Sequence, residues 1–347
     1  MRFDFDALLA NRSSAFVVAE LSANHHRSYQ IAADTIHAIR ESGADAVKVQ
    51  TYTPDTITLD SDKDYFKIKQ GTIWDGRTLY ELYQEAYMPW EWQPDLKRLA
   101  ESIGLTFFSA PFDNTATDLL EGMGVAMYKI ASFEITDIPL IEYVASKGKP
   151  VIISTGIATL TDIEEALSAC KRVGNNRVAL LKCTSEYPTP IAAANLRTIP
   201  NMRETFHTVV GLSDHTSGMV ASICAVTLGA KIIEKHFILD RKIPSPDASF
   251  SMEPQEFAQM VRAIREAEEA IGRVSYDLSE KVKKSREHAR SLFVTMDMKR
   301  GDAFTGDNLR SIRPGFGMHP RHLTEVLGRR ARTDIARGTP LDWAMIE

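Results

Sequence analysis

The sequence predicts a (β/α)8 barrel over residues 1–272, a linker over residues 273–284 and a small β-rich domain over residues 285–347. Eight short β-rich apolar runs alternate with helical patterns over roughly 255 residues, the count and length of such a barrel. Beyond Gly272 this periodicity gives way to charged residues and then to short runs broken by glycine. A doubly wound open sheet would produce the same alternation, so periodicity alone leaves both architectures open.

The elements follow one another in a regular order. Strands are expected at Phe16–Glu20, Asp45–Gln50, Leu105–Ser109, Ala126–Ala131, Pro150–Thr155, Val178–Thr184, His207–Ser213 and Ala230–His236. Helical patterns lie between and after them, for example over residues 31–43, 161–174 and 253–272. Several of these patterns end in glycine, the usual helix stop.

One connection, between Thr51 and Trp90, is too long for a plain loop and is rich in Tyr and Trp. A connection of this length in a compact domain is usually a lid or a binding loop. The alternative is a surface excursion whose aromatic side chains pack on the rim of the barrel.

Residues 285–347 are expected to form short strands and turns. A domain of about sixty residues has only a marginal hydrophobic core. We therefore expect this domain to lean on the barrel or on a partner subunit.

Composition and charge limit the function classes. Apolar residues make up 44% of the 347 residues, and no apolar run approaches the roughly 20 residues that span a bilayer. The first residues lack the apolar core of a signal peptide. Three scattered cysteines (Cys170, Cys183, Cys224) suit a reducing compartment better than a disulfide framework. We expect a cytoplasmic protein that binds no membrane.

The net charge of −5 hides a division between the two parts of the chain. From Arg273 onward there are 15 Lys+Arg and 10 Asp+Glu, whereas the preceding part has 26 and 36. A basic appendage on an acidic body is compatible with nucleic-acid binding, with packing on the body, or with covering an anionic substrate. No nucleic-acid module is recognisable, so we expect no nucleic-acid partner.

Polar side chains gather where the predicted strands end, which is where barrel enzymes place their chemistry. The set comprises three lysines (Lys48, Lys129, Lys182), four serines (Ser109, Ser132, Ser154, Ser213) and two glutamates (Glu20, Glu234). A lone lysine after an apolar strand is usually a solvated end, but three on alternate strands favour a functional interpretation. Lysines and hydroxyls at one mouth are suited to holding a phosphate and a carboxylate together.

Nucleotide binding and Schiff-base chemistry are the two alternatives for this mouth. No P-loop or GxGxxG motif follows a strand, which disfavours nucleotide binding. The second alternative is a Schiff base on one of the lysines, as in an aldolase, which needs a desolvated lysine with a lowered pKa.

Two histidines, His215 and His236, lie at the ends of consecutive predicted strands. Each alone is more often a hydrogen-bonded structural group than a ligand. As a pair they can converge on one metal ion, and two imidazoles without a thiolate leave open positions for water and substrate. That arrangement favours a catalytic, exchangeable divalent ion over a structural zinc.

These residues stand in phrases that resemble the sialic acid synthase family. The phrases are AELSANH (Ala19–His25), VKVQTYTPD (Val47–Asp55), YKIASFE (Tyr128–Glu134), STGIAT (Ser154–Thr159), KCTSEYPTP (Lys182–Pro190), GLSDHT (Gly211–Thr216) and IEKHF (Ile233–Phe237). In the tail, RPGFGMHP (Arg313–Pro320) resembles that family's antifreeze-like (SAF) domain. Within the family, Gln70–Trp92 is most similar to the pseudaminic acid synthase branch.

The resemblance implies a TIM barrel with an SAF domain and a metal-dependent transferase reaction. Phosphoenolpyruvate would condense with an open-chain amino sugar, 2,4-diacetamido-2,4,6-trideoxy-L-altrose, to give pseudaminic acid and phosphate, for surface glycan or flagellin glycosylation. The metal would be Mn²⁺, with Mg²⁺ or Co²⁺ as alternatives. The resemblance also implies a domain-swapped homodimer.

The family's motifs also imply a role for individual residues. Phosphoenolpyruvate would be held by Lys48, Ser109, Lys129, Ser132, Ser154, Lys182 and Ser213. The sugar would be contacted by Gln50, Tyr187, Asp247 and Arg313, with Arg313 reaching in from the partner subunit. His215 and His236 would ligate the metal, and Glu20 would handle protons near the reacting carbons, with Glu234 beside them.

The chain departs from the family pattern in three places. Asn24-His25 is followed by His26-Arg27, where sialic-type members usually continue Asn-Gly. Ala110 stands where relatives often carry a second hydroxyl beside Ser109, and Asp247 lies in a loop that matches the family only approximately. The rival functions are an N-acetylneuraminate or legionaminate synthase that uses a mannosamine-type sugar, a Schiff-base pyruvate aldolase and a non-catalytic carbohydrate-binding protein.

Overall fold

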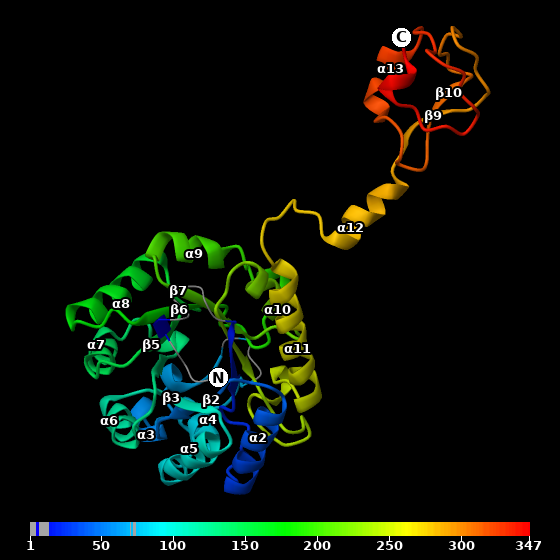
Figure 1. The fold of residues 1–347 in the computed structure, drawn as a ribbon. Helices are drawn as coiled ribbons and strands as arrows, with labels where there is room; N and C mark the ends of the chain where they lie inside the picture. The colour runs from blue at the N-terminus through cyan, green and yellow to red at the C-terminus, as the bar shows by residue number, and fades with distance from the viewer. Residues whose placement is uncertain (1–4, 7–13, 70, 72–73) are drawn as a thin grey trace. The chain divides into compact units, whose positions relative to one another are not determined.

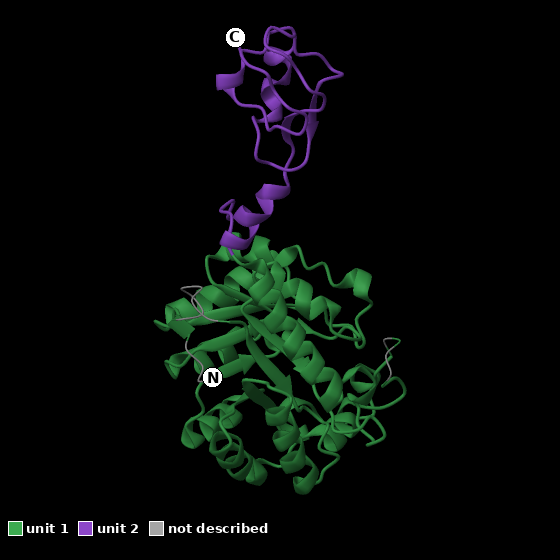
Figure 2. Ribbon diagram, turned by 45° about the vertical axis from the view of Figure 1, so that its right-hand side comes forward, with its two compact units in different colours: residues 1–272 green, residues 273–347 purple. Residues whose placement is uncertain are grey.

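The protein was analysed as a computed structural model that describes residues 5–6, 14–69, 71 and 74–347. The chain divides into two compact units, Met1–Gly272 and Arg273–Glu347, which are coloured separately in Figure 2.

Unit 1 is a closed barrel of eight parallel strands, each paired with its neighbours in sequence order, with β8 closing onto β1. The strands are β1 (Phe16–Glu20), β2 (Ala46–Thr51), β3 (Thr106–Pro111), β4 (Tyr128–Ile130), β5 (Val151–Ser154), β6 (Val178–Cys183), β7 (Val209–Asp214) and β8 (Ile232–His236). This closure confirms the predicted (β/α)8 barrel and excludes the doubly wound open sheet.

Helices connect consecutive strands and surround the barrel (Figure 1). They are α2 (Tyr29–Glu41), α5 (Gln93–Ser102), α6 (Asn114–Met123), α7 (Ile138–Ser146), α8 (Leu160–Arg172), α9 (Thr198–Phe206), α10 (Val220–Thr227) and α11 (Pro254–Ile271). Side-chain caps fix several of their first turns; the Asp113 side chain, for example, accepts from the Ala116 backbone N–H at the start of α6. Within the described part of the chain, no helix has the length and apolar character needed to cross a membrane.

The barrel has two hydrophobic cores because successive strand residues point to opposite faces. The larger core fills the space between strands and helices and includes Val47, Leu180 and Leu212. The smaller core fills the barrel interior and includes Ala46 and Leu181. Membership of one core or the other shows which residues of each strand point inward, and it therefore decides which strand-end residues reach the mouth.

The long connection between β2 and α5 is folded. It contains α3 (Pro54–Ile57), a 3₁₀ turn at Asp64–Phe66, α4 (Leu79–Ala86) and a 3₁₀ turn at Trp90–Trp92. The Trp90 indole donates to the Tyr52 carbonyl oxygen at 3.0 Å, which ties the end of the segment to its start. We call residues 52–92 the inserted segment. Residues 70 and 72–73 of this segment lie outside the described residues.

Unit 2 begins with α12 (Glu280–Ser285) and a 3₁₀ turn at Arg286–His288. The antiparallel pair β9 (Ser291–Val294) and β10 (Leu309–Ile312) follows, and then come a 3₁₀ turn at Pro320–His322, α13 (Leu323–Val326) and a 3₁₀ turn at Trp343–Met345. Its core is small and contains Leu292, Phe304 and Val326.

Candidate active site

Four buried charged side chains meet at the carboxyl ends of the barrel strands. The Lys48 ammonium lies 2.8 Å from Glu20 Oε2 and 3.3 Å from Glu234 Oε1. Lys129 Nζ lies 3.3 Å from the same Glu234 oxygen, and the Ser213 hydroxyl donates to it at 3.1 Å. Burying charges is costly even when they are paired, and such clusters are frequent at functional sites. These residues come from β1, β2, β4, β7 and β8, so only the closed barrel brings them together.

The two carboxylates have opposite pKa shifts. Burial raises the pKa of Glu20 to about 7, against the opposing effect of Lys48. Burial would also raise the pKa of Glu234, but Lys129 and Lys48 together lower it to about 2. Glu234 therefore stays ionised as the counter-charge of both lysines, whereas Glu20 can exchange a proton near neutral pH.

A group of hydroxyls and one thiol lies beside these charges. The Ser132 hydroxyl donates to Cys183 Sγ at 3.3 Å. Among the described residues the buried Ser154 hydroxyl has no hydrogen-bond partner, and the buried Ser185 hydroxyl has Tyr187 as its polar neighbour. A Cβ atom added to Gly156 would lie 2.1 Å from Ser185 Oγ and 2.7 Å from Ser132 Oγ, so only glycine leaves this space open. Buried hydroxyls without partners are suited to receive an anion.

The two histidines predicted as metal ligands face each other, with ring centroids 5.4 Å apart. His215 Nδ1 lies 3.1 Å from the Thr184 carbonyl oxygen, a contact that fixes the ring and leaves Nε2 for a ligand. His236 Nδ1 is buried and lies 3.7 Å from the Asp247 carboxylate. Burial and the neighbouring His215 lower the pKa of His236 well below its usual value, which keeps it neutral as a ligand must be.

The donor set is sparse, as a catalytic metal site requires. Two imidazoles fit a divalent ion that completes its coordination with water and substrate. Among the residues that the structure describes, no group of three or more His, Cys, Asp or Glu side chains has the geometry to hold a metal ion.

Three of the four predicted sugar contacts surround the same mouth. The Gln50 amide donates to Glu20 Oε1 at 3.1 Å, and the Tyr187 ring lies 4.4 Å from the His215 ring. Asp247 is buried, which raises its pKa. The fourth, Arg313, is exposed in unit 2 after β10, so its contact with the sugar stays a prediction.

Two predicted residues do not reach the mouth. Ser109 follows Phe107 on the outward face of β3, where its hydroxyl lies 2.6 Å from Thr51 Oγ1 and 3.0 Å from the Val49 carbonyl oxygen. Lys182 shares the outward face of β6 with Leu180, and its ammonium donates to the Thr184 hydroxyl. The strand alternation places both side chains outside the barrel interior, so their contact with phosphoenolpyruvate stays a prediction.

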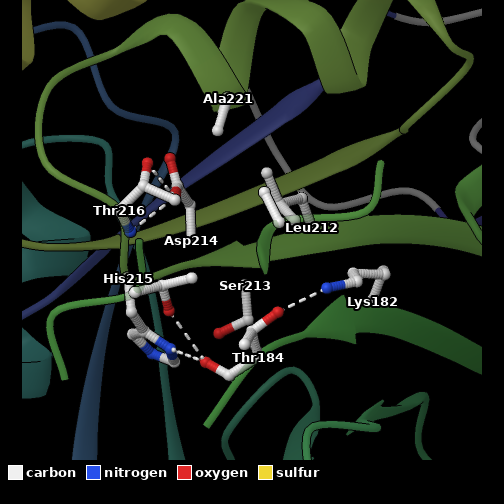
Figure 3. Close-up of a pocket in the computed structure, with 10 residues that line it drawn as sticks. Lys182, Thr184, Leu212, Ser213, Asp214, His215, Thr216 and Ala221 are labelled. Carbon is white, nitrogen blue, oxygen red and sulfur yellow. Dashed lines mark hydrogen bonds between the residues drawn. The ribbon is translucent and has the colours of Figure 1, made fainter. Parts of the chain in front are cut away.

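Lys182 lines a small pocket together with Leu212, Ala221 of α10 and two residues of the site, Ser213 and His215 (Figure 3). Asp214 and Thr216 complete one side of this pocket, where Asp214 accepts from the Thr216 hydroxyl at 2.8 Å.

Three residues at the mouth were missed. The inward residue at the end of β6 is Cys183, 3.8 Å from His215 Nδ1, and Ser185 follows it. Glu134 lies just after Ser132, and burial raises its pKa to about 7. All three stand inside phrases already singled out in the sequence, KCTSEYPTP and YKIASFE. Strand alternation was the available signal for Cys183, whereas Ser185 and Glu134 lie beyond the ends of β6 and β4, where alternation no longer applies.

A closed barrel with acidic, basic and imidazole groups gathered at one end of its strands is built as an enzyme. Comparison with known proteins identifies which kind. The chain belongs to the NeuB family, whose model matches residues 35–276, and the model of the SAF domain matches residues 289–347.

Relatives of similar length match this chain over nearly all of its residues. Pseudaminic acid synthase of Helicobacter pylori is 48% identical over 332 residues, which cover 95% of this chain and 97% of that protein. Pseudaminic acid synthase of Campylobacter jejuni is 46% identical over 326 residues, covering 94% and 95%. N,N'-diacetyllegionaminic acid synthase of Legionella pneumophila is 34% identical over 339 residues, covering 96% and 95%.

The fold agrees with a solved structure of a similar protein. N-acetylneuraminic acid synthetase from Leptospira borgpetersenii, in complex with citrate, matches with a TM-score of 0.70 at 29% identity. The match covers 79% of this chain and 90% of that chain.

Proposed function

We propose that this chain condenses phosphoenolpyruvate with 2,4-diacetamido-2,4,6-trideoxy-L-altrose to give pseudaminic acid and phosphate. Its family condenses phosphoenolpyruvate with an amino sugar. Identity to the pseudaminic acid synthases is 46–48%, against 34% to the legionaminic acid synthase, which supports this sugar. The observation that carries the proposal is the buried Lys48–Glu234–Lys129 cluster beside a facing pair of imidazoles.

Phosphoenolpyruvate binds at the two lysines. Lys48 and Lys129 offset its charge, and Ser213, which already donates to Glu234, stands ready to donate to the substrate. The free hydroxyl of Ser154 and the hydroxyl of Ser132 hold the phosphate. Fixed donors of this kind also stabilise the charge that gathers on the phosphate as it departs.

His215 and His236 hold a divalent ion, with Mn²⁺ as our preferred choice and Mg²⁺ or Co²⁺ as alternatives. When bound, the ion supplies Lewis-acid polarisation of the sugar aldehyde. The protein's own contribution is to orient the His215 ring through the Thr184 carbonyl oxygen and to keep the His236 ring neutral by burial.

Glu20 orients the water that attacks C2 once the new carbon–carbon bond has formed. Its pKa of about 7 allows it to accept a proton from that water. Gln50, which donates to Glu20, binds the sugar next to this carboxylate. Tyr187 and Asp247 also contact the sugar.

In a domain-swapped homodimer, the partner subunit's Arg313 completes the sugar site. We place the enzyme in the cytoplasm. The exposed position of Arg313 in a small basic unit supports its assignment to the sugar site. The test is an Arg313→Ala variant, which should raise KM for the sugar while KM for phosphoenolpyruvate stays within twofold.

A panel of sugars with phosphoenolpyruvate and Mn²⁺, followed by phosphate release, tests the main proposal. We expect turnover with the altrose precursor, little with N-acetylmannosamine, and loss of turnover on chelation with recovery when Mn²⁺ returns. Equal release from both sugars would reject the branch assignment.

The aldolase alternative is tested in the same samples. Burial lowers the pKa of Lys129, a property that a Schiff-base lysine needs, although Glu234 opposes the shift. Trapping of a pyruvate adduct by borohydride, with activity that survives chelation, would favour the aldolase. Sugar binding unchanged in His215→Ala, without any turnover in the parent protein, would favour a carbohydrate-binding protein.

A further inference from the structure

An aromatic wall flanks the imidazole pair. We use this name for Trp74, Tyr187 and Phe250. The Tyr187 ring lies 4.4 Å from His215, 5.3 Å from Phe250 and 5.8 Å from Trp74, centroid to centroid. Phe250 also packs 4.9 Å from His236. The wall therefore begins at the imidazole pair and extends away from it to Trp74.

Trp74 comes from the inserted segment and is oriented by its polar edge. Its indole N–H donates to the Pro246 carbonyl oxygen at 3.3 Å, in the loop that carries Asp247. Because a protein acceptor already occupies this N–H, the surface that Trp74 offers to a ligand beside Tyr187 is the apolar ring.

Arg27 fastens the inserted segment to the barrel. Its guanidinium donates to the Gln84 carbonyl oxygen at 2.9 Å and to the Tyr87 hydroxyl at 3.1 Å, and it lies 4.8 Å from the Tyr87 ring centroid. His26 contacts the Pro244 carbonyl oxygen at 3.0 Å, which fastens the same turn to the loop beneath Trp74.

The backbone at Arg27 makes this arrangement informative. Its φ is 51°, in the left-handed region that favours glycine, and glycine is what sialic-type members usually carry there. An arginine at that position has a less favourable backbone conformation than a glycine. Its side chain, which a glycine lacks, holds α4 of the inserted segment in place.

We propose that Trp74 is a specificity-determining residue that receives the C6 methyl group of a 6-deoxy amino sugar, and that Arg27 is the positioning residue for the segment that carries it. This inference rests on the proposed function and adds the part of the sugar that the site selects.

The lengths agree with this assignment. An extended six-carbon chain spans about 6 Å from C1 to C6 with ordinary carbon–carbon bonds. With the aldehyde carbon at the imidazole pair, a chain of this length passes along Tyr187, whose ring lies 4.4 Å from that of His215, and its far carbon points to Trp74, which packs 5.8 Å from Tyr187.

The chemistry explains the selection. A methyl group that packs against the indole ring loses no hydrogen bond to water. A hydroxymethyl group loses its hydrogen bonds to water, and the indole N–H cannot replace them because it already donates to the Pro246 carbonyl oxygen. An apolar pocket discriminates against one added hydroxyl by about a hundredfold at most. We therefore expect a preference of between tenfold and a hundredfold for the 6-deoxy sugar.

The experiment compares kcat/KM for 2,4-diacetamido-2,4,6-trideoxy-L-altrose and its 6-hydroxy analogue. The variants are Trp74→Ala and Arg27→Gly, and Tyr65→Ala is the control because Tyr65 is an aromatic residue of the same segment with 92% exposure. Trp74→Ala should lower the preference at least tenfold through KM for the 6-deoxy sugar, with KM for phosphoenolpyruvate unchanged. Arg27→Gly should lower the preference less, and Tyr65→Ala should keep it.

A preference unchanged in active Trp74→Ala overturns the inference, as does an equal rise in KM for phosphoenolpyruvate. If Trp74→Ala does not fold, Arg27→Gly decides, and an unchanged preference in that variant overturns it. A parent enzyme that turns over N-acetylmannosamine but neither altrose sugar refutes the proposed function instead. The preference is then measured with N-acetylmannosamine and its 6-deoxy analogue.

Discussion

Replacing Lys235 by methionine will destabilise the barrel and loosen the imidazole pair. Lys235 and Asp214 form a fully buried ion pair between β8 and β7, with Nζ 2.9 Å from Oδ2. Each lies beside site residues in the chain: Asp214 precedes His215, and Lys235 precedes His236. The pair therefore locks the two strand ends in register, and we expect its loss to weaken metal binding at the proposed His215–His236 site.

The magnitude follows from the groups left behind. Removing one partner of a buried pair costs about 3–5 kcal/mol. The lower end applies because Asp214 keeps hydrogen bonds from the Thr216 backbone N–H, the Thr216 hydroxyl and the Ser222 hydroxyl. The Thr216 carbonyl oxygen also loses its donor, Lys235 Nζ, which adds about 1 kcal/mol. The total of about 4 kcal/mol corresponds to a fall of about 10 °C in Tm.

Thermal unfolding of the barrel, followed at pH 5 and pH 8, is the assay. Without Lys235, the buried carboxylate of Asp214 has a pKa raised above its unfolded value, so the folded state binds the extra proton and stability falls as pH rises. The deficit should be larger at pH 8. Adding Asp214→Asn should recover about 2 kcal/mol by removing the uncompensated charge. Equal deficits at both pH values, or a double variant no more stable than Lys235→Met, would refute the reasoning. Lys299→Met, which breaks an exposed pair, should leave Tm unchanged.

Three further outcomes test the active site. In Glu20→Gln, the rise of kcat/KM with pH through about 7 should disappear from the steady-state pH profile, since ionised Glu20 is the base; a retained rise would exclude that role. Gly156→Ala should raise KM for phosphoenolpyruvate at least tenfold, because its Cβ would fill the space between Ser185 and Ser132; an unchanged KM would place the phosphate elsewhere. Lys182→Met should keep this KM within twofold, whereas Lys129→Met should raise it about a hundredfold or more; equal effects would place Lys182 in the site.

The fold was predictable because every barrel strand is a short apolar run that lies between sequence patterns typical of helices. What could not be predicted was the direction of individual side chains. Parallel barrel strands are buried on both faces, so their sequences carry no alternation of polar and apolar residues to mark the inside. In VALLKC, the prediction chose the charged Lys182, but the register of β6 turns Cys183 inward and Lys182 outward.

The residues that could be predicted are those whose chemistry is unusual for a strand end. Glu20, Lys48, Lys129 and Glu234 were found because charges are rarely buried singly, and the structure pairs them. Hydroxyls are weaker signals, because a serine is equally suited to a helix interface. For that reason the outward direction of Ser109 and the burial of the Ser185 hydroxyl could not be predicted.

The charge cluster has a consequence for how substrate enters. Two ammonium groups and two carboxylates sum to zero, so an arriving trianion meets cations that already have internal counterions. Binding is then an exchange of anions in which Glu20 and Glu234 yield their places on Lys48 and Lys129. The two carboxylates therefore keep the buried lysines paired until the substrate arrives, and Glu20 leaves Lys48 in the ionised form that it needs as a base.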